Sequence, residues 1–175
     1  MAQGQALSAY ARAYEVTKDK KYLLKGNRCL AFLLKPIDKG GTLANLKDIH
    51  PSLTNYYIFE EYPVDPSSLT LNGFLFTLLG LYDWWKITLT ANKKHALLAE
   101  KYFKEGIKTT KKILKYYDIG GYTTYDLAHV VYGMEPKIAG YYHAIHIYLL
   151  HALHSVTQEK VLDDYSKLWA SYIKR

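Results

Sequence analysis

Most of the chain repeats its apolar residues at intervals of three and four, which is the spacing of one face of an α-helix. This spacing predicts six helices, over residues 2–16, 20–34, 66–87, 93–116, 138–156 and 160–174. The third helix has a clear start signal, because Asp65 is a favoured N-cap residue and Pro66 is tolerated in a first helical turn. All five prolines lie between the predicted helices or at a first turn, so we expect an all-α fold.

A short polar repeat pairs the predicted helices into hairpins. Thr, any residue, Asp, Asn or Glu, and then Lys occur in this order at residues 17–20, 90–93 and 157–160. Each copy stands between two predicted helices, where such residues favour a tight turn that caps the second helix. The repeat therefore predicts three helical hairpins.

The two helices of a hairpin differ in character. Residues 71–82 and 141–150 are apolar or aromatic all round, as in helices buried on most sides, whereas residues 93–116 are amphipathic and rich in Lys. An inner and an outer layer of helices is the pattern of an (α/α) toroid. Three hairpins are too few to close one, so we expect an incomplete barrel with an apolar flank. That flank would pack against a second copy, giving a homodimer, or against an N-terminal part of a longer protein.

Two connectors, residues 35–65 and 117–137, are long for a single compact domain, and this length favours a function. Both are rich in Tyr, Gly and acidic residues, and residues 55–59 could form one strand of a β-hairpin. In a toroid, both connectors would enter the inner helices from the same rim. We expect residues 1–175 to form one domain, as part of a larger domain or protein.

The charge balance points to acidic partners. The chain carries 20 Lys and 3 Arg and a net charge of +7, which attracts polyanions. The scarcity of Arg and the lack of a glycine-rich aromatic strand motif argue against nucleic-acid binding. No apolar run is long enough to span a membrane, and the single Cys29 excludes an internal disulfide. Tyrosine is abundant, with 18 copies, and its ring and hydroxyl suit both core edges and sugar clefts.

Polar residues gather at or just before the starts of the predicted inner helices. They are Gln3 and Gln5, then Glu60 to Tyr62, then Tyr125 to His129, and Tyr141 to His143. Helix N-termini offer free N–H groups and partial positive charge, which suit a carboxylate. His143 and His146 have the i, i+3 spacing of metal ligands, but no third ligand is evident, so we expect no metal site.

Several stretches resemble the C-terminal catalytic domain of heparosan D-glucuronyl C5-epimerases. They are residues 1–6 (MAQGQA), 60–63 (EEYP), 66–74 (PSSLTLNGF), 80–83 (GLYD), 125–129 (YDLAH) and 142–147 (YHAIHI). They follow the order of the family and extend over nearly the whole chain. The resemblance implies an α/α toroid and a cofactor-free isomerase of the kind that acts in heparan sulfate biosynthesis. It also implies upstream regions in a complete enzyme, including a β-rich domain.

Such an enzyme inverts C5 of a hexuronic acid in an acidic polysaccharide, from D-glucuronate to L-iduronate. The chemistry needs donors that neutralise the C6 carboxylate and acid/base groups on both faces of the sugar. By the resemblance, the catalytic residues are Glu61, Tyr62, Tyr125 and Tyr142. Glu61 and Tyr142 would transfer the protons, and Tyr62 and Tyr125 would stabilise the carboxylate-derived charge. We expect burial and the neighbouring acid to raise the pKa of Glu61.

Four further residues are expected to bind substrate: Gln5, Asn72, His129 and His143. One position departs from the vertebrate-type pattern, because Ala128 stands where that pattern has an Arg that could hold a carboxylate or sulfate. Lys137 is a candidate for a relocated cation. Two alternatives stay open: a uronate lyase on the same scaffold and a non-catalytic module that binds acidic glycans. The compartment is also open, since a complete prokaryotic protein would be cytoplasmic and part of a eukaryotic parent would lie in the Golgi lumen.

Overall fold

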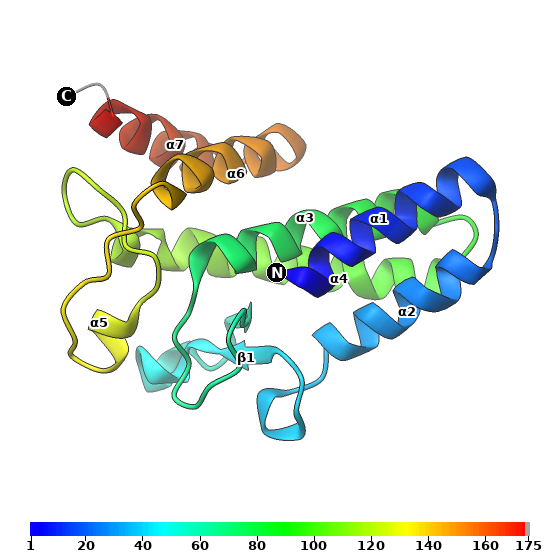
Figure 1. Ribbon diagram of the computed structural model, residues 1–175, viewed down its shortest axis with the longest axis horizontal. Coiled ribbons are helices and arrows are strands. Elements are labelled where there is room, and N and C mark those ends of the chain that lie inside the picture. Colours follow the sequence, from blue (N-terminus) through cyan, green and yellow to red (C-terminus); the bar gives the residue numbers. More distant parts are fainter. Residues whose placement is uncertain (174–175) are drawn as a thin grey trace.

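The computed structural model describes residues 1–173, and helices dominate it (Figure 1). The helices are α1 (Ala2–Thr17), α2 (Lys21–Leu33), α3 (Leu71–Thr88), α4 (Lys93–Tyr117), α5 (Ala128–Val131), α6 (Tyr142–Thr157) and α7 (Lys160–Ile173). The mainly α-helical prediction is confirmed. The predicted end of the last helix, at residue 174, lies outside the described residues.

Three helical hairpins form the scaffold, as the repeat predicts. They are α1–α2, α3–α4 and α6–α7, and the three polar tetrapeptides lie at their turns. Lys18 and Gln158 end α1 and α6 in the left-handed conformation, with φ of 57° and 58°. The Asp19 carboxylate, two residues before the start of α2, accepts a hydrogen bond from the backbone N–H of Lys21 at 2.9 Å. Local side-chain chemistry thus sets the turn at which the chain reverses.

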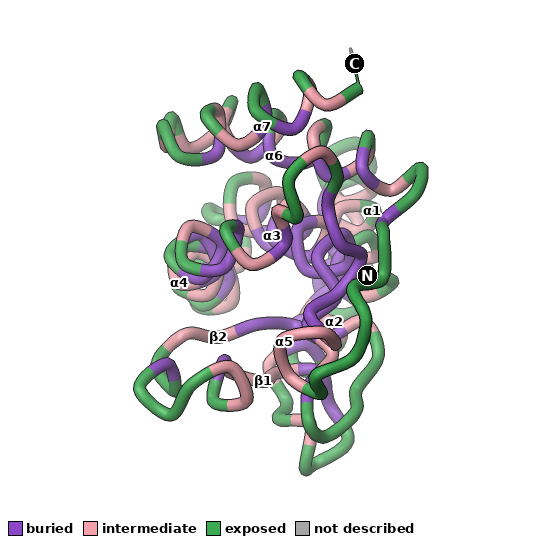
Figure 2. The backbone as a smooth tube through the Cα atoms, turned by 90° about the vertical axis from the view of Figure 1, so that its left-hand side faces the viewer, coloured by how far each residue is buried: buried purple, intermediate pink, exposed green. Residues whose placement is uncertain are grey.

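The hairpins pack side by side in two layers. Helix α3 lies in the middle of the inner layer, between α1 and α6, while α4 contacts α2 and α7 in the outer layer (Figure 1). Helix α3 is buried along most of its length (Figure 2). Gly80 lets α1 approach closely, because a Cβ at this position would lie 2.0 Å from the carbonyl oxygen of Gly4. The result is an arc of three hairpins rather than a closed ring.

Both connectors lie at the same end of the inner helices. The first contains strands β1 (Leu43–Asn45) and β2 (Tyr57–Phe59), which pair antiparallel with Leu43 opposite Phe59. It also contains three 3-10 turns: η1 (Ile37–Lys39), η2 (Leu46–Asp48) and η3 (Pro51–Leu53). The Leu127 N–H donates to the Ser68 carbonyl at 2.9 Å and joins the second connector to the first. The strand expected at residues 55–59 is therefore present, although shorter.

The predicted starts of two helices are wrong. Helix α3 begins at Leu71 rather than at Pro66. The Leu69 N–H donates to the Glu60 carboxylate and the Ser68 carbonyl accepts from the Leu127 N–H, so neither group takes part in a helical hydrogen bond. Helix α6 begins at Tyr142 rather than at residue 138. There the Lys137 carbonyl accepts from Tyr125 at 2.7 Å, which keeps the preceding residues extended. Tertiary hydrogen bonds override the local helix signal in both cases.

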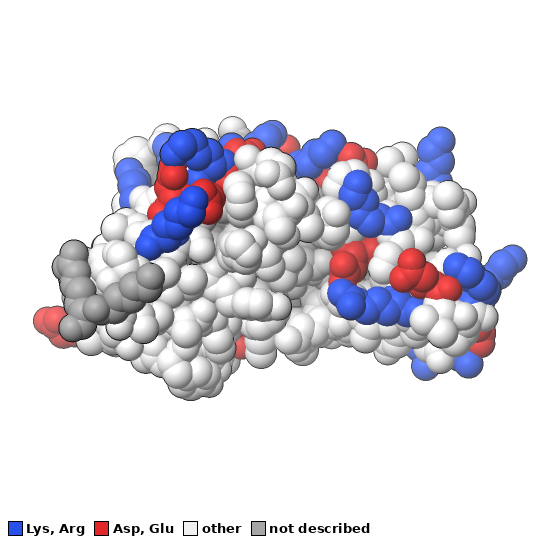
Figure 3. All heavy atoms as spheres, turned by 90° about the horizontal axis from the view of Figure 1, so that it is seen from above, with Lys and Arg blue, Asp and Glu red and all other residues white. Residues whose placement is uncertain are grey.

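The surface is divided by charge. In the view of Figure 3, Lys and Arg side chains concentrate along one long edge and at one end, and a broad area between them carries no charged residue. Two tyrosines at α6 have exposed side chains: Tyr141, which directly precedes the helix, is 72% exposed, and Tyr148, within it, is 68% exposed. No helix within the described residues has the length and apolar character that crossing a bilayer requires.

Candidate active site

Three separate segments bring the predicted catalytic tyrosines together. The hydroxyls of Tyr62, after β2, and Tyr125, in the second connector, lie 3.3 Å apart. The rings of Tyr125 and Tyr142 meet edge to face, with centroids 5.1 Å apart. Tyr62 is 51% exposed, so the cluster is open to solvent on that side. The structure thus gathers phenol groups from residues 62, 125 and 142 at one end of the helical layers.

The carboxylate of Glu61 lies over the first turn of α3. The side-chain amide of Asn72 donates to Glu61 Oε2 at 3.3 Å, and Asn72 itself is fully buried. Gly73 makes room for this contact, because a Cβ there would lie 2.3 Å from the same Glu61 oxygen. The positive end of the helix dipole favours a negative group at this position. Asn72 and the start of α3 therefore hold Glu61 in one place.

Backbone hydrogen bonds fix Tyr125 between two other elements of the site. Its carbonyl accepts from the Leu71 N–H at 3.2 Å, and its N–H donates to the Lys137 carbonyl at 2.7 Å. Leu71, which bonds Tyr125, and Asn72, which bonds Glu61, are the first two residues of α3. The positions of Glu61 and Tyr125 are thus set by the same helical turn.

Two of the phenols keep their protons more tightly than a free tyrosine. Burial raises the pKa of Tyr125, and the hydrogen bond to Tyr62 and the charge of Glu61 raise it further. The pKa of Tyr142 is raised chiefly by its interaction with the Tyr141 hydroxyl, and the charge of Glu61 adds to the effect. Both side chains are therefore neutral hydrogen-bond donors near pH 7.

A lysine provides positive charge at the cluster. Lys137 Nζ lies 4.4 Å from the centroid of the Tyr125 ring, a distance typical of a cation–π contact. Ala128 occupies the first turn of the short helix α5 and offers no charge. Lys137 is therefore placed to attract an anionic group toward the phenols.

Burial acts on the other acid of the Glu60–Glu61 pair. Glu60 is only 2% exposed, and its carboxylate accepts from the Leu69 N–H at 3.0 Å. Desolvation raises its pKa to about 7, and the charges of Asp126 and Asp48 add to this. Glu60 thus faces the interior and has a raised pKa, whereas Glu61 is partly exposed.

The four expected substrate-binding residues have different environments. Asn72 is in contact with Glu61, as described above. Gln5 is exposed on the first turn of α1, next to Gly4, which packs on α3. His129 lies in α5, and its buried Nδ1 has no hydrogen-bond partner within residues 1–173. His143 is 1% exposed with both ring nitrogens bonded inside the protein, so it has none left for a substrate.

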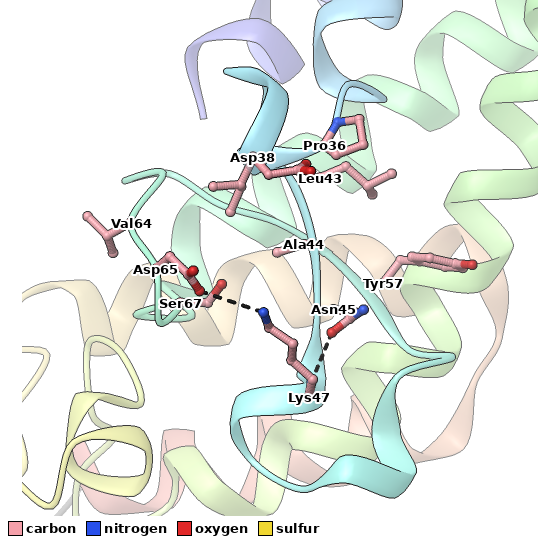
Figure 4. A pocket seen from close by; sticks show the side chains of 11 residues that line it. Pro36, Asp38, Leu43, Ala44, Asn45, Lys47, Tyr57, Val64, Asp65 and Ser67 are labelled. Carbon is pink, nitrogen blue, oxygen red and sulfur yellow. Dashed lines mark hydrogen bonds and ion pairs between the residues drawn. The ribbon is translucent and has the colours of Figure 1, made fainter.

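A separate pocket of about 290 Å³ lies beside β1 (Figure 4). Its lining includes Leu43, Tyr57 and Val64, and Lys47 reaches across it to Asp65 with an ion pair of 3.7 Å. None of the four predicted catalytic residues lines this pocket. Within residues 1–173, no group of three or more His, Cys, Asp or Glu side chains is arranged to hold a metal ion.

The fold and the cluster define a class: a domain of helical hairpins with a carboxylate and phenol groups at one end of its inner helices. The family model described as "D-glucuronyl C5-epimerase C-terminus" matches residues 1–171, and the chain belongs to this family. It is 32% identical to D-glucuronyl C5-epimerase of Caenorhabditis elegans over 98% of the chain and 28% of that protein. It is also 29% identical to an uncharacterised protein of Methanocaldococcus jannaschii, over 97% of the chain and 50% of that protein. The chain therefore spans half or less of the length of these relatives.

Proposed function

We propose that this domain carries the proton-transfer groups of a uronosyl C5-epimerase that acts on an acidic polysaccharide. One observation carries the proposal: Glu61 and the phenols of Tyr62, Tyr125 and Tyr142 converge from distant parts of the sequence. Membership of the C5-epimerase family and the net charge of +7 support it.

The reaction starts at the C5–H bond, next to the C6 carboxylate of the hexuronic acid. A base takes the proton, and the electron pair of the broken bond moves into a C5=C6 enediolate. This intermediate carries two negative charges, so hydrogen-bond donors or cations must stabilise it. A second group then protonates C5 from the opposite face, which inverts the centre. No oxidant or cofactor is needed, because the carbon keeps its oxidation state.

In the direction from D-glucuronate to L-iduronate, Glu61 is the base. Its carboxylate can take a proton, and Asn72 holds it in position by a hydrogen bond. Tyr142 is the acid, because its raised pKa keeps the phenol protonated until the enediolate forms. The substrate ring would occupy the open side of the cluster, between these two groups.

The negative charge that develops on the substrate is stabilised by Tyr125, Tyr62 and Lys137. Neutral phenols donate hydrogen bonds, and such donors are worth most at a site that excludes water. Lys137 lies against Tyr125 and adds the cation that Ala128 does not provide. These three residues would hold the C6 carboxylate while the proton at C5 is exchanged.

The test is solvent deuterium incorporation at C5 of a heparosan oligosaccharide, measured with the complete protein. Tyr142→Phe removes the proposed acid, and we expect incorporation to fall by roughly 100-fold or more. Tyr148→Phe is the matched control, because Tyr148 lies on the same helix and is 68% exposed. Equal rates for the wild type and Tyr142→Phe would refute the assigned role. An unsaturated, ultraviolet-absorbing product would instead identify a lyase, and binding without exchange would identify a glycan-binding module.

A further inference from the structure

A buried polar network involves residues close in sequence to Tyr125 and Tyr142. The Thr123 hydroxyl is 3.0 Å from Nδ1 of His143 and 3.0 Å from Nδ1 of His146. Nε2 of His143 is 3.0 Å from the carbonyl oxygen of Trp169, on α7. Thr123, His143 and His146 are at most 1% exposed. The network therefore joins the second connector, α6 and α7 inside the protein.

One arrangement of hydrogens satisfies all three contacts of this network. Nε2 of His143 donates to the Trp169 carbonyl, which can only accept, and Nδ1 of His143 accepts from the Thr123 hydroxyl. The Thr123 hydroxyl has one hydrogen, so it accepts the second bond from Nδ1–H of His146. Burial lowers the pKa of His146 to about 3, in keeping with a neutral ring. The threonine hydroxyl is thus the hub of a directed chain of hydrogen bonds.

Two members of this network stand next to two of the phenols in the sequence. Thr123 precedes Tyr125 by two residues, and His143 directly follows Tyr142. The Ala139 N–H also donates to the Thr123 carbonyl at 2.8 Å, so the segments before Tyr125 and before Tyr142 run together. The Thr123–His143 bond therefore links the segment that carries Tyr125 to the first turn of the helix that carries Tyr142.

The outer helix α7 supports the same link. The Trp169 indole N–H donates to Asp118 Oδ2 at 3.2 Å, while its carbonyl accepts from His143. Asp118 begins the second connector, which leads to Thr123 and Tyr125. One residue of α7 thus holds both the connector and the start of α6.

We propose that Thr123 is a positioning residue: its hydroxyl, by binding His143 and His146, sets the separation of Tyr125 and Tyr142. This inference rests on the proposed epimerase function. Thr123 does not touch substrate, because it is fully buried. Its loss should therefore slow proton transfer with little change in substrate affinity.

The experiment compares Thr123→Val, Thr123→Ser and Thr110→Val in the complete protein. Val removes the hydroxyl at nearly constant volume, and Ser keeps it. Thr110 is the control, because it is fully buried in α4 and, within residues 1–173, its hydroxyl bonds only to the Gly106 carbonyl of the same helix. Misplacement of a reacting group by about 1 Å costs on the order of 100-fold. For Thr123→Val we expect a loss of about 10- to 100-fold in kcat for C5 deuterium exchange and less than about a threefold change in KM.

Thr123→Ser should restore most of kcat, and Thr110→Val should lower the melting temperature without lowering kcat. A kcat for Thr123→Val that matches Thr110→Val, or a Thr123→Ser variant without restored kcat, would overturn the inference. If Thr123→Val does not fold, the kcat of Thr123→Ala is compared with that of Thr110→Ala, with the same expected difference.

A nuclear Overhauser contact between the Tyr125 and Tyr142 rings separates this inference from the proposed function. The contact should weaken in folded Thr123→Val and keep its intensity in Thr110→Val, and equal intensity in both variants would overturn the positioning role. If the wild type shows no C5 exchange while this contact depends on Thr123, the epimerase proposal fails and the positioning of the two rings stands.

Discussion

The buried acid Glu60 should lower the free energy of unfolding as pH rises, and one substitution should remove this effect. Its pKa is raised from 4.5 to about 7 in the folded chain, mainly by desolvation. The folded state holds the Glu60 proton more tightly than the unfolded state does. Proton binding by Glu60 therefore stabilises the fold fully below about pH 4.5, and this stabilisation is lost as pH rises through 7. A pKa rise of this size corresponds to about 3 kcal/mol of unfolding free energy above pH 8.

Glu60→Gln keeps the side-chain oxygen that accepts from the Leu69 N–H but cannot ionise. The variant should therefore match the wild type near pH 4.5 and gain up to about 3 kcal/mol on it by pH 8.5. Urea unfolding across this pH range measures the difference. Glu135→Gln, at an exposed position, is the control for replacing a carboxylate by an amide at the surface. A difference between Glu60→Gln and wild type that stays constant within about 0.5 kcal/mol over the whole range would refute the reasoning.

Two further predictions concern the contacts around Glu61 and Tyr125. Gly73→Ala places a methyl group 2.3 Å from Glu61 Oε2, so it should displace the carboxylate and lower C5 exchange by roughly 10- to 100-fold. Gly106→Ala is the control, because it also overpacks a helical glycine, but in α4 and against Leu78, 2.2 Å from Cδ2. Equal losses in the two variants would contradict the proposed contact. Lys137→Gln should raise KM for an acidic oligosaccharide by roughly tenfold at low salt and change kcat little, because a positive charge beside the phenols attracts the substrate. Steady-state kinetics measures both constants, and an unchanged KM would exclude Lys137 from substrate binding.

The helical hairpins could be predicted because their signals are local. The apolar period identified the six long helices, and the polar tetrapeptides located the three turns between them. The wrong helix starts show where local signals fail. Asp65 and Pro66 resemble an N-cap and first turn, but the bond between Glu60 and the Leu69 N–H holds the next residues in another conformation. That bond depends on the position of Glu60 directly after β2, and a local sequence pattern does not predict where this strand lies relative to Leu69.

The convergence of the candidate site residues could be predicted from the sequence, but their electrostatics could not. The motifs named Glu61, Tyr62, Tyr125 and Tyr142, and the structure gathers them. Which acid of the Glu60–Glu61 pair is buried depends on how β2 packs, because neighbouring side chains on an extended chain point to opposite sides. The contacts of Thr123 could not be predicted from the sequence, since its partners lie 20 and 23 residues away on another element.

The central claim is that C5 is deprotonated from one face and reprotonated from the other by two different groups. The most direct measurement is the deuterium content at C5 of both the recovered substrate and the epimerised product, at low conversion in heavy water. Two groups on opposite faces predict deuterium in the product and almost none in the recovered substrate. Equal labelling of substrate and product would show a single group acting on both faces, and no label in either would contradict proton transfer at C5 altogether.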